Sequence, residues 1–389
     1  MTADPTSAIK KRKKVWFYAA TGFDIPFLII LLAILVVGLV SLYSASYAYA
    51  FYHYDGDSLY FIKRQGIFAL VGVAALFIAS LVDYHRWHGL AWIMWLGSLV
   101  LLGIALLLPS STGIHRWIRL PGIGQFQPSE IAKFALIVLF AHLISLNYKR
   151  IHTFVHGFAP LIIVLGITCG LVVIEPHLSG TVLLCGLGFV LMLVGGVRKR
   201  YLAGLAVLAA IVVYVVIFVL GYEQERIEVW NDPMGVYTSG VDGRNQAWQT
   251  VQSLFTIGSG GLLGQGPGNS RQKHLFLPEP QNDFIFAVVC EELGFIGAVL
   301  IIGLFGLLVW RGFYIAMHAS DRFGGMLATG LTAQIGIQVL LNIAVVTNSF
   351  PNTGISLPFF SYGGTSLVML LAQMGVVLAV SRYSHIEKK

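Results

Sequence analysis

Charged side chains are scarce in this chain of 389 residues. Asp, Glu, Lys and Arg together make up 11% of it, whereas a soluble domain carries about 25%. Hydrophobic residues make up 57%, and the mean hydropathy is +0.78. A chain this apolar could not cover its surface with polar groups in water. The composition therefore excludes a soluble globular protein and predicts an all-α protein that folds in a lipid bilayer.

Cysteine and the common cofactor motifs are also scarce. The three cysteines, Cys169, Cys185 and Cys290, lie inside apolar runs, so we expect buried, unreactive thiols rather than a disulfide framework or a zinc site. The pair His152 and His156 has no carboxylate near it in the sequence, which disfavours a metal site there. No glycine-rich phosphate loop, dinucleotide fingerprint or HExxH pattern is present, so ATP, NAD and metalloprotease chemistry have no support.

Long apolar runs are what the chain has in abundance. A run that crosses a hydrocarbon core of about 30 Å needs about 20 residues. The first run follows a basic cluster, as in a signal peptide, but it exceeds the roughly 7–15 residues of a signal-peptide core and is expected to remain as a span. We predict about ten transmembrane helices, at residues 25–44, 65–82, 88–108, 128–146, 158–174, 179–196, 202–220, 284–309, 326–346 and 366–381.

The net charge of +7 reflects topology rather than nucleic-acid binding. Lys and Arg gather in alternate short loops, and the positive-inside rule assigns these loops to the cytoplasm. Both termini are then cytoplasmic: a basic segment at 1–24 precedes a membrane domain at 25–382, and a short tail follows at 383–389. The largest extracellular loop is predicted at 221–283, between the seventh and eighth spans. Loops of this length are usually functional or disordered.

A second outer loop, at 347–365, contains no charge, two prolines and three glycines. This composition indicates a re-entrant segment packed against protein. No internal repeat is evident in the chain, which disfavours a repeat-built transporter.

Several basic residues lie on the predicted outer side, where the positive-inside rule disfavours them. They could bind an anionic ligand such as a pyrophosphate, since Arg matches its oxygens in geometry. Alternatively, they contact lipid head groups or form ion pairs within the loops. The residues are Lys63, Arg64, Arg116, Arg119, Arg226, Arg244, Arg271 and Lys273.

Polar residues within the predicted spans are a second signal, because each is costly in lipid. Glu130 and Lys133 share a helical face and are expected to form an ion pair, either at a functional site or as a structural link. Gln334, Gln338 and Asn342 recur every four residues. We expect this polar stripe to face the helix bundle rather than lipid, mainly as a packing element.

Asp283 lies at the predicted outer start of the span 284–309. Partial desolvation at this boundary would raise the pKa of its carboxyl group and suit it to act as a general base. An aspartate at a helix start is also an ordinary N-cap. Position alone leaves both interpretations open.

With these residues in view, the chain resembles the SEDS proteins, which include FtsW, RodA and SpoVE, from about Asp24 to Arg382. The stretch Asn269–Lys273 is more similar to FtsW and SpoVE than to RodA. Five places are typical of the family: Gln127–Lys133 (QPSEIAK), Trp248-Gln249 with Gln252-Ser253, Ile257–Gly266, Leu277–Phe286 with its PEP run and Glu291–Gly294 after it, and Thr353–Gly364.

The chain departs from the family pattern in two places. His177 in Glu175-Pro-His177 stands where an acidic residue is usual, so no role is carried over to it. Extra residues around 236–245 leave Arg244 without a family counterpart, whereas Arg226 fits the pattern.

The resemblance implies a peptidoglycan glycosyltransferase of the bacterial cytoplasmic membrane that polymerises lipid II at its outer face, in division or sporulation. Asp283 would take the proton from the acceptor hydroxyl, and a β-1,4 bond would form with inversion. Because pyrophosphate leaves without protonation, one carboxylate should suffice, unlike in glycoside hydrolysis. The Gly258–Gly266 stretch would let the backbone approach the substrate closely.

The resemblance also implies a substrate-binding set and partners. A divalent cation, Mg or Mn, could assist, but no metal ligand is assigned. The expected partners are lipid II and a class B penicillin-binding protein that acts as transpeptidase, with no nucleic acid. The alternatives are a lipid II flippase and a non-catalytic scaffold for the transpeptidase. The substrate-binding residues are expected to be Arg64, Arg116, Gln127, Ser129, Glu130, Lys133, Glu175, Arg226, Gln249, Ser253, Ser259, Lys273, Glu279 and Ser361.

Overall fold

The computed structural model describes residues 22–108, 117–120, 124–175, 177–215, 224–274 and 276–384. Within these ranges the chain is helical apart from a two-stranded antiparallel hairpin and its connecting segments. A short 3₁₀ turn and a π turn precede α5. The elements are α1 (Ile25–His53), α2 (Tyr60–Leu81), α3 (His85–Leu107), β1 (Ile118–Leu120), β2 (Gly124–Phe126), α4 (Pro128–Leu146), α5 (Ala159–Ile174), α6 (Leu178–Val194), α7 (Lys199–Tyr214), α8 (Gln224–Asn231), α9 (Pro233–Thr238), α10 (Val241–Gly260), α11 (Ile285–Met317), α12 (Arg322–Val346) and α13 (Gly364–Arg382).

Eight helices in the described part of the chain are long and apolar enough to cross a membrane, and α6 is a shorter apolar helix. The predicted multi-pass helical architecture is confirmed, while the count of ten remains a prediction. Two helices are longer than expected: α1 continues to His53 and α11 to Met317. The segment 45–64 between the first two predicted spans is therefore largely helical, and the alanines at 45, 48 and 50 favour this continuation of α1.

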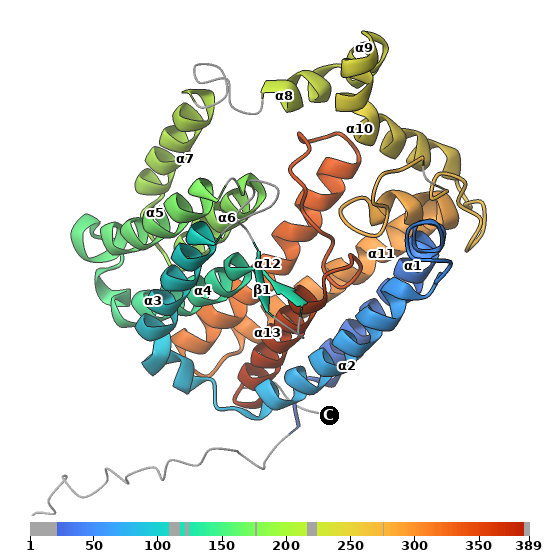
Figure 1. Ribbon diagram of the computed structural model, residues 1–389. Helices are drawn as coiled ribbons and strands as arrows, with labels where there is room; N and C mark the ends of the chain where they lie inside the picture. Colours follow the sequence, from blue (N-terminus) through green and yellow to red (C-terminus); the bar gives the residue numbers. More distant parts are fainter. Residues whose placement is uncertain are drawn as a thin grey trace, which may run out of the picture.

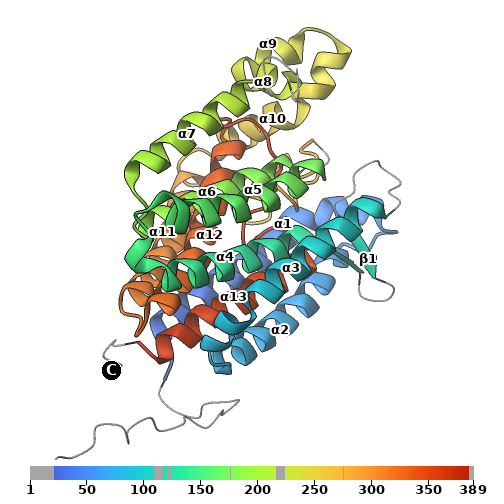
Figure 2. The ribbon, with the colours of Figure 1, turned by 90° about the vertical axis from the view of Figure 1, so that its left-hand side faces the viewer.

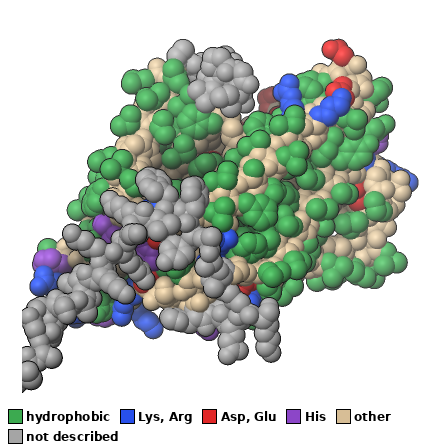
Figure 3. Space-filling model, turned by 90° about the horizontal axis from the view of Figure 1, so that it is seen from below, with side chains coloured by type: hydrophobic (Ala, Val, Ile, Leu, Met, Phe, Trp, Pro, Cys, Tyr) green, Lys and Arg blue, Asp and Glu red, His purple; other side chains and the backbone are tan. Residues whose placement is uncertain are grey.

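Three helices form the centre of the bundle (Figure 1). In the apolar stretch of each of the eight spans, the share of residues that are buried is 78% in α4 and 67% in α12 and α13, against 28–39% in the other spans. Gln334, Gln338 and Asn342 on α12 are almost fully buried, which confirms that the polar stripe faces protein. The outer helices instead present apolar side chains, and such side chains are spread widely over the face in Figure 3.

The two ends of the membrane domain meet at one end of the bundle. Asp24 caps α1 by accepting a hydrogen bond from the Phe27 N–H, and its own N–H donates to Ser381 Oγ on α13 at 3.0 Å. Arg311 on α11 forms a two-pronged ion pair with the Asp24 carboxylate, at 3.0 and 2.8 Å. In Figure 2 the hairpin and α8–α10 lie at the opposite end from the end of α13.

The predicted loop 221–283 is largely helical where it is described. It contains α8, α9 and α10, and a small core of Val229, Ala247 and Val251 holds them together. The composition of this segment, rich in Gly, Gln and Asn, did not reveal these helices, and its extracellular location remains a prediction. The segment 347–363 has no helix, and Ile355, Leu357 and Phe360 in it are buried against the bundle, as predicted.

The glycine-rich stretch packs against a break in α11. At Gly294 the helix has a φ of 66°, which interrupts its hydrogen bonds. Gln265 N and Gly266 N donate to the carbonyls of Glu291 and Glu292, and Phe295 N donates to Gly261 O. A Cβ on Gly264 would lie 2.2 Å from Glu292 O. These glycines therefore let the backbone of residues 261–266 lie close to the backbone of α11.

The cysteines are free, but one expectation about them was wrong. Cys169 and Cys290 are buried, whereas Cys185 is exposed on α6. An apolar run does not reveal which helix face meets lipid, and a thiol is tolerated on either face.

Replacing Arg311 with Met should lower the free energy of unfolding by about 3 kcal/mol, because it leaves the buried Asp24 carboxylate without its cation. Thermal unfolding of the detergent-solubilised protein measures this. The double change Asp24→Asn, Arg311→Met should recover part of the loss. Arg322→Met serves as the control, since Arg322 is exposed, and should cost less than about 1 kcal/mol. Equal losses in all three variants would contradict the pairing.

Candidate functional site

A cavity of about 1110 Å³ opens where several helices begin. The N-terminal ends of α4, α6 and α13 contribute to its wall, together with α2, the turn before α11, the hairpin region, Gln338 of α12 and the segment 354–356. Helix N-termini carry partial positive charge from their unpaired N–H groups. The cavity therefore favours anionic ligands before any charged side chain is counted.

Asp283 lines this cavity. It does not cap α11, whose N-cap is Phe284 without a side-chain cap hydrogen bond, so the capping interpretation was wrong. Asn342 Nδ2 donates to Asp283 O at 2.8 Å and to Ile355 O at 2.6 Å, which fixes the backbone beside α12. Gly354 packs so closely that a Cβ there would lie 3.2 Å from Asp283 Oδ2.

The segment 355–362 holds the Asp283 turn from its other side. Ser361 Oγ donates to Asn282 O at 2.8 Å, and the Tyr362 N–H donates to Gln281 O at 2.8 Å. The same Ser361 Oγ accepts from the Leu357 N–H at 2.8 Å. The predicted site residue Ser361 is thus buried and supports the backbone that carries Asp283.

Glu130 and Lys133 form the ion pair that their spacing predicts, at 2.7 Å, and both side chains are buried. Glu130 lies in the first turn of α4, where the helix end favours a carboxylate. Its Oε2 is buried and has no hydrogen-bond partner within the described residues. Both residues line the cavity, so the pair offers it a cation and an unused acceptor.

Arg64 brings a second cation to the cavity. Its guanidinium lies 4.1 Å from the centre of the Tyr60 ring. Nearby, burial raises the pKa of Tyr362, although the charge of Arg64 opposes that shift. The phenol therefore stays neutral and can both donate and accept a hydrogen bond.

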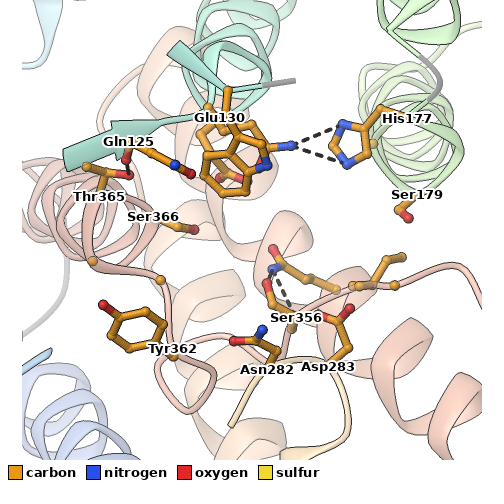
Figure 4. A pocket seen from close by; sticks show the side chains of 18 of the residues that line it. Gln125, Glu130, His177, Ser179, Asn282, Asp283, Ser356, Tyr362, Thr365 and Ser366 are labelled. Carbon is orange, nitrogen blue, oxygen red and sulfur yellow. Dashed lines mark hydrogen bonds between the residues drawn. The ribbon is translucent and has the colours of Figure 1, made fainter. Parts of the chain in front are cut away.

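His177, whose role the sequence left in doubt, also lines the cavity. Gln127 Nε2 lies 3.3 Å from its Nδ1, and Ser129 Oγ lies 3.4 Å from the same nitrogen. Figure 4 shows His177 and Glu130 across the cavity from Asn282 and Asp283. The predicted residues Gln127 and Ser129 therefore position the imidazole on the wall that faces Asp283.

Other predicted site residues lie away from the cavity wall. Ser253 is buried and donates to Val346 O, and Ser259 donates to Thr256 O. Lys273 is buried and pairs with Glu292 at 2.9 Å. Glu175 is fully buried at the end of α5. Arg116 lies outside the described residues, and the roles of all five in substrate binding remain predictions.

Three further predicted residues gather beside α10. Arg226 donates to Asn352 O at 3.0 Å, and Asn352 Nδ2 donates to Gln249 Oε1 at 3.1 Å. Gln249 and Glu279 line a second, shallower hollow. Of the outer cations, Lys63 pairs with Asp57 at 3.0 Å, which supports the ion-pair interpretation for that residue.

Some cavity residues had no distinguishing signal in the sequence. Gln125 comes from the hairpin and Trp117 directly precedes it, and an apolar-run search does not detect either. Asn282, Ser356 and Ser366 lie in or beside family-like stretches, but nothing in those stretches marks them individually. Among the described residues, no group of three or more His, Cys, Asp or Glu side chains could hold a metal ion.

The chain is similar to curated proteins over nearly its whole length. The chain is 40% identical to stage V sporulation protein E of Bacillus subtilis over 375 residues, which cover 94% of this chain and 98% of that protein. It is 38% identical to a probable peptidoglycan glycosyltransferase FtsW of Geobacter metallireducens, with 92% and 94% covered.

Solved structures agree. A chain in a peptidoglycan synthase complex that coordinates polymerization and crosslinking superposes with a TM-score of 0.77 at 30% identity, covering 93% of this chain and 98% of that one. The rod shape determining protein RodA of Thermus thermophilus gives 0.67 at 28% identity, with 94% and 98% covered. The model of the cell cycle protein family that groups FtsW, RodA and SpoVE matches residues 25–386. The chain therefore belongs to the FtsW/RodA/SpoVE family, on its FtsW/SpoVE branch.

Proposed function

We propose that this chain is a multi-pass enzyme of the bacterial cytoplasmic membrane, a peptidoglycan glycosyltransferase that polymerises lipid II with Asp283 as its base. The observation that carries the proposal is the carboxylate of Asp283, whose backbone Asn342 holds, in a cavity that also receives two cations and several helix N-termini. The names of the FtsW relatives and of the peptidoglycan synthase complex support this activity.

The reaction joins two lipid-linked sugars. The Asp283 carboxylate takes the proton of the acceptor's 4-hydroxyl, and that oxygen attacks the anomeric carbon of the donor. The bond from this carbon to the pyrophosphate breaks, and the pyrophosphate leaves with the electron pair on its lipid. Attack from the opposite face inverts the α-linked carbon and gives a β-1,4 bond.

Binding of the donor requires positive charge at the place where the leaving pyrophosphate develops negative charge. Arg64 and Lys133 line the cavity and would hold the pyrophosphate, helped by the helix N-termini. Glu130 orients Lys133 through their 2.7 Å ion pair. We place this end of the bundle at the outer face of the membrane, because the basic short loops lie at the other end.

The proposal extends to a partner. We propose that the chain works beside a class B penicillin-binding protein, since a chain of similar fold occurs in a complex that couples polymerization to crosslinking.

Asp283→Asn should reduce lipid II polymerisation by the purified protein by about 10²–10⁴-fold, because an amide cannot accept the proton. Product on gels of fluorescent lipid II measures the loss. Asp242→Asn, an exposed change on α10, is the control and should retain activity. Normal polymerisation by Asp283→Asn would refute the base assignment. Lost lipid II flipping in liposomes with normal polymerisation would favour transport instead.

Lys133→Met should destabilise the protein by about 3–5 kcal/mol, since Glu130 would be left charged and buried. The double variant Glu130→Gln, Lys133→Met removes both charges and should regain most of that stability. It should still fail to polymerise lipid II, because the cation for the pyrophosphate is gone. Full activity in the stable double variant would show that the pair is purely structural.

Gly354→Ala should lower the polymerisation rate with only a modest effect on stability. The residue has a φ of 68° and would place its Cβ 3.2 Å from Asp283 Oδ2. The backbone strain costs about 1–2 kcal/mol, and the carboxylate must shift. Gly89→Ala, where a Cβ meets nothing within 4 Å, is the matched control. Equal rates for the two variants would show that the carboxylate position is not critical.

A further inference from the structure

A second hollow, of about 660 Å³, opens between α10 and the turn that precedes α11. Its wall consists of Asn245, Trp248, Gln249, Pro278 and Glu279. It therefore offers an indole ring, two amides and one carboxylate. No Lys or Arg lines it, so it does not suit a phosphate, in contrast to the Asp283 cavity.

Two hydrogen-bonded links join this hollow to the Asp283 cavity. Asn282, which lines the cavity, donates from Nδ2 to Glu279 Oε2 at 2.8 Å. On the other side, Gln249 Oε1 accepts from Asn352 Nδ2, and Asn352 Oδ1 accepts from the Gly354 N–H at 3.2 Å. Gly354 lies on the cavity wall against Asp283. The two depressions therefore share their dividing wall.

The lining side chains are held in place and accessible. Trp248 Nε1 donates to Phe276 O at 2.9 Å, which fixes the indole, while Asn245 and Glu279 are exposed. Glu279 has a φ of 44°, and Asn282 donates to it from both its backbone N–H and its side chain. The hollow is therefore preorganised, so a ligand would lose little freedom in ordering it.

This combination suits a neutral carbohydrate. A pyranose ring presents an apolar face that packs on an aromatic ring, and its hydroxyl and amide groups pair with planar polar side chains. Amides both donate and accept, and the carboxylate accepts two hydroxyls. A lipid tail would find too little apolar surface here, and a pyrophosphate would meet Glu279.

We propose that this hollow, defined by Asn245, Trp248, Gln249, Pro278 and Glu279, binds the glycan strand at sugars beyond the reacting pair. The inference rests on the proposed glycosyltransferase function. A strand held here stays at high effective concentration beside Asp283 after each bond forms. The hollow then sets how many sugars are added before the product departs, rather than the rate of the chemical step.

The test uses the purified full-length protein, fluorescent lipid II and a soluble β-1,4-linked tetrasaccharide fragment of the polymer. Asn245→Ala should shorten the glycan products and weaken tetrasaccharide binding by about five-fold, the effect of one lost hydrogen bond. The rate of the first coupling should not change. Gln246→Ala, exposed on the same helix one residue along, is the matched control and should leave both readouts unchanged.

Trp248 separates ring stacking from a merely structural role. Trp248→Phe keeps an aromatic face but loses the bond to Phe276 O, so it should largely retain product length and tetrasaccharide binding. Trp248→Ala should lose both product length and tetrasaccharide binding. Asn245→Ala should unfold at the wild-type temperature, so that its effects on the same two readouts do not come from unfolding. If neither Asn245→Ala nor Trp248→Ala alters tetrasaccharide binding, the subsite is refuted.

Failure of the glycan-binding proposal can be distinguished from failure of the proposed glycosyltransferase function. Asp283→Asn should bind the tetrasaccharide as the wild type does, even though it cannot polymerise, so the subsite is measurable without catalysis. Unchanged tetrasaccharide binding in Asn245→Ala, together with activity lost only when a transpeptidase is added, would identify the hollow as a protein interface and overturn the glycan assignment.

Discussion

Non-helical backbone inside a membrane-spanning bundle must find its hydrogen bonds within the protein, because lipid offers none. The segments 281–284 and 353–363 meet this requirement by pairing with each other and with α12. Asn342 is the central donor, since its single Nδ2 bonds the carbonyls of Asp283 and Ile355. The position of the Asp283 backbone thus follows from the need to pair buried carbonyls, and the polar stripe on α12 supplies the donor.

The same constraint explains the break in α11. The carbonyls of Glu291 and Glu292 lose their helical partners near Gly294, and the glycine-rich turn after α10 supplies N–H groups in their place. Lys273, Ser44 and Ser270 bond the two carboxylates beside it. The result ties α1, α10 and α11 together through the glycine-rich turn and the two carboxylates.

Charge divides the end of the bundle that carries the cavity into two environments. The cavity gathers helix N-termini, Arg64 and Lys133, whereas the hollow beside α10 has Glu279 and amides. The pyrophosphate of the proposed substrate is anionic, whereas the sugar rings attached to it are neutral. The proposed polymerase handles both groups, and the hydrogen-bonded wall from Glu279 to Asn282 divides the two environments.

The sequence alone determined the features that depend on local composition. Apolar runs predicted the spans, spacing predicted the Glu130–Lys133 pair and the buried face of α12, and motifs predicted the family. Position could not decide between Asp283 as an N-cap and as a cavity carboxylate, because that depends on which residue begins the helix. Nor could it reveal that His177 faces Asp283, that α8–α10 fold on a small core, or that the glycine-rich stretch serves α11. Those facts depend on contacts between segments far apart in the chain, which only tertiary packing brings together.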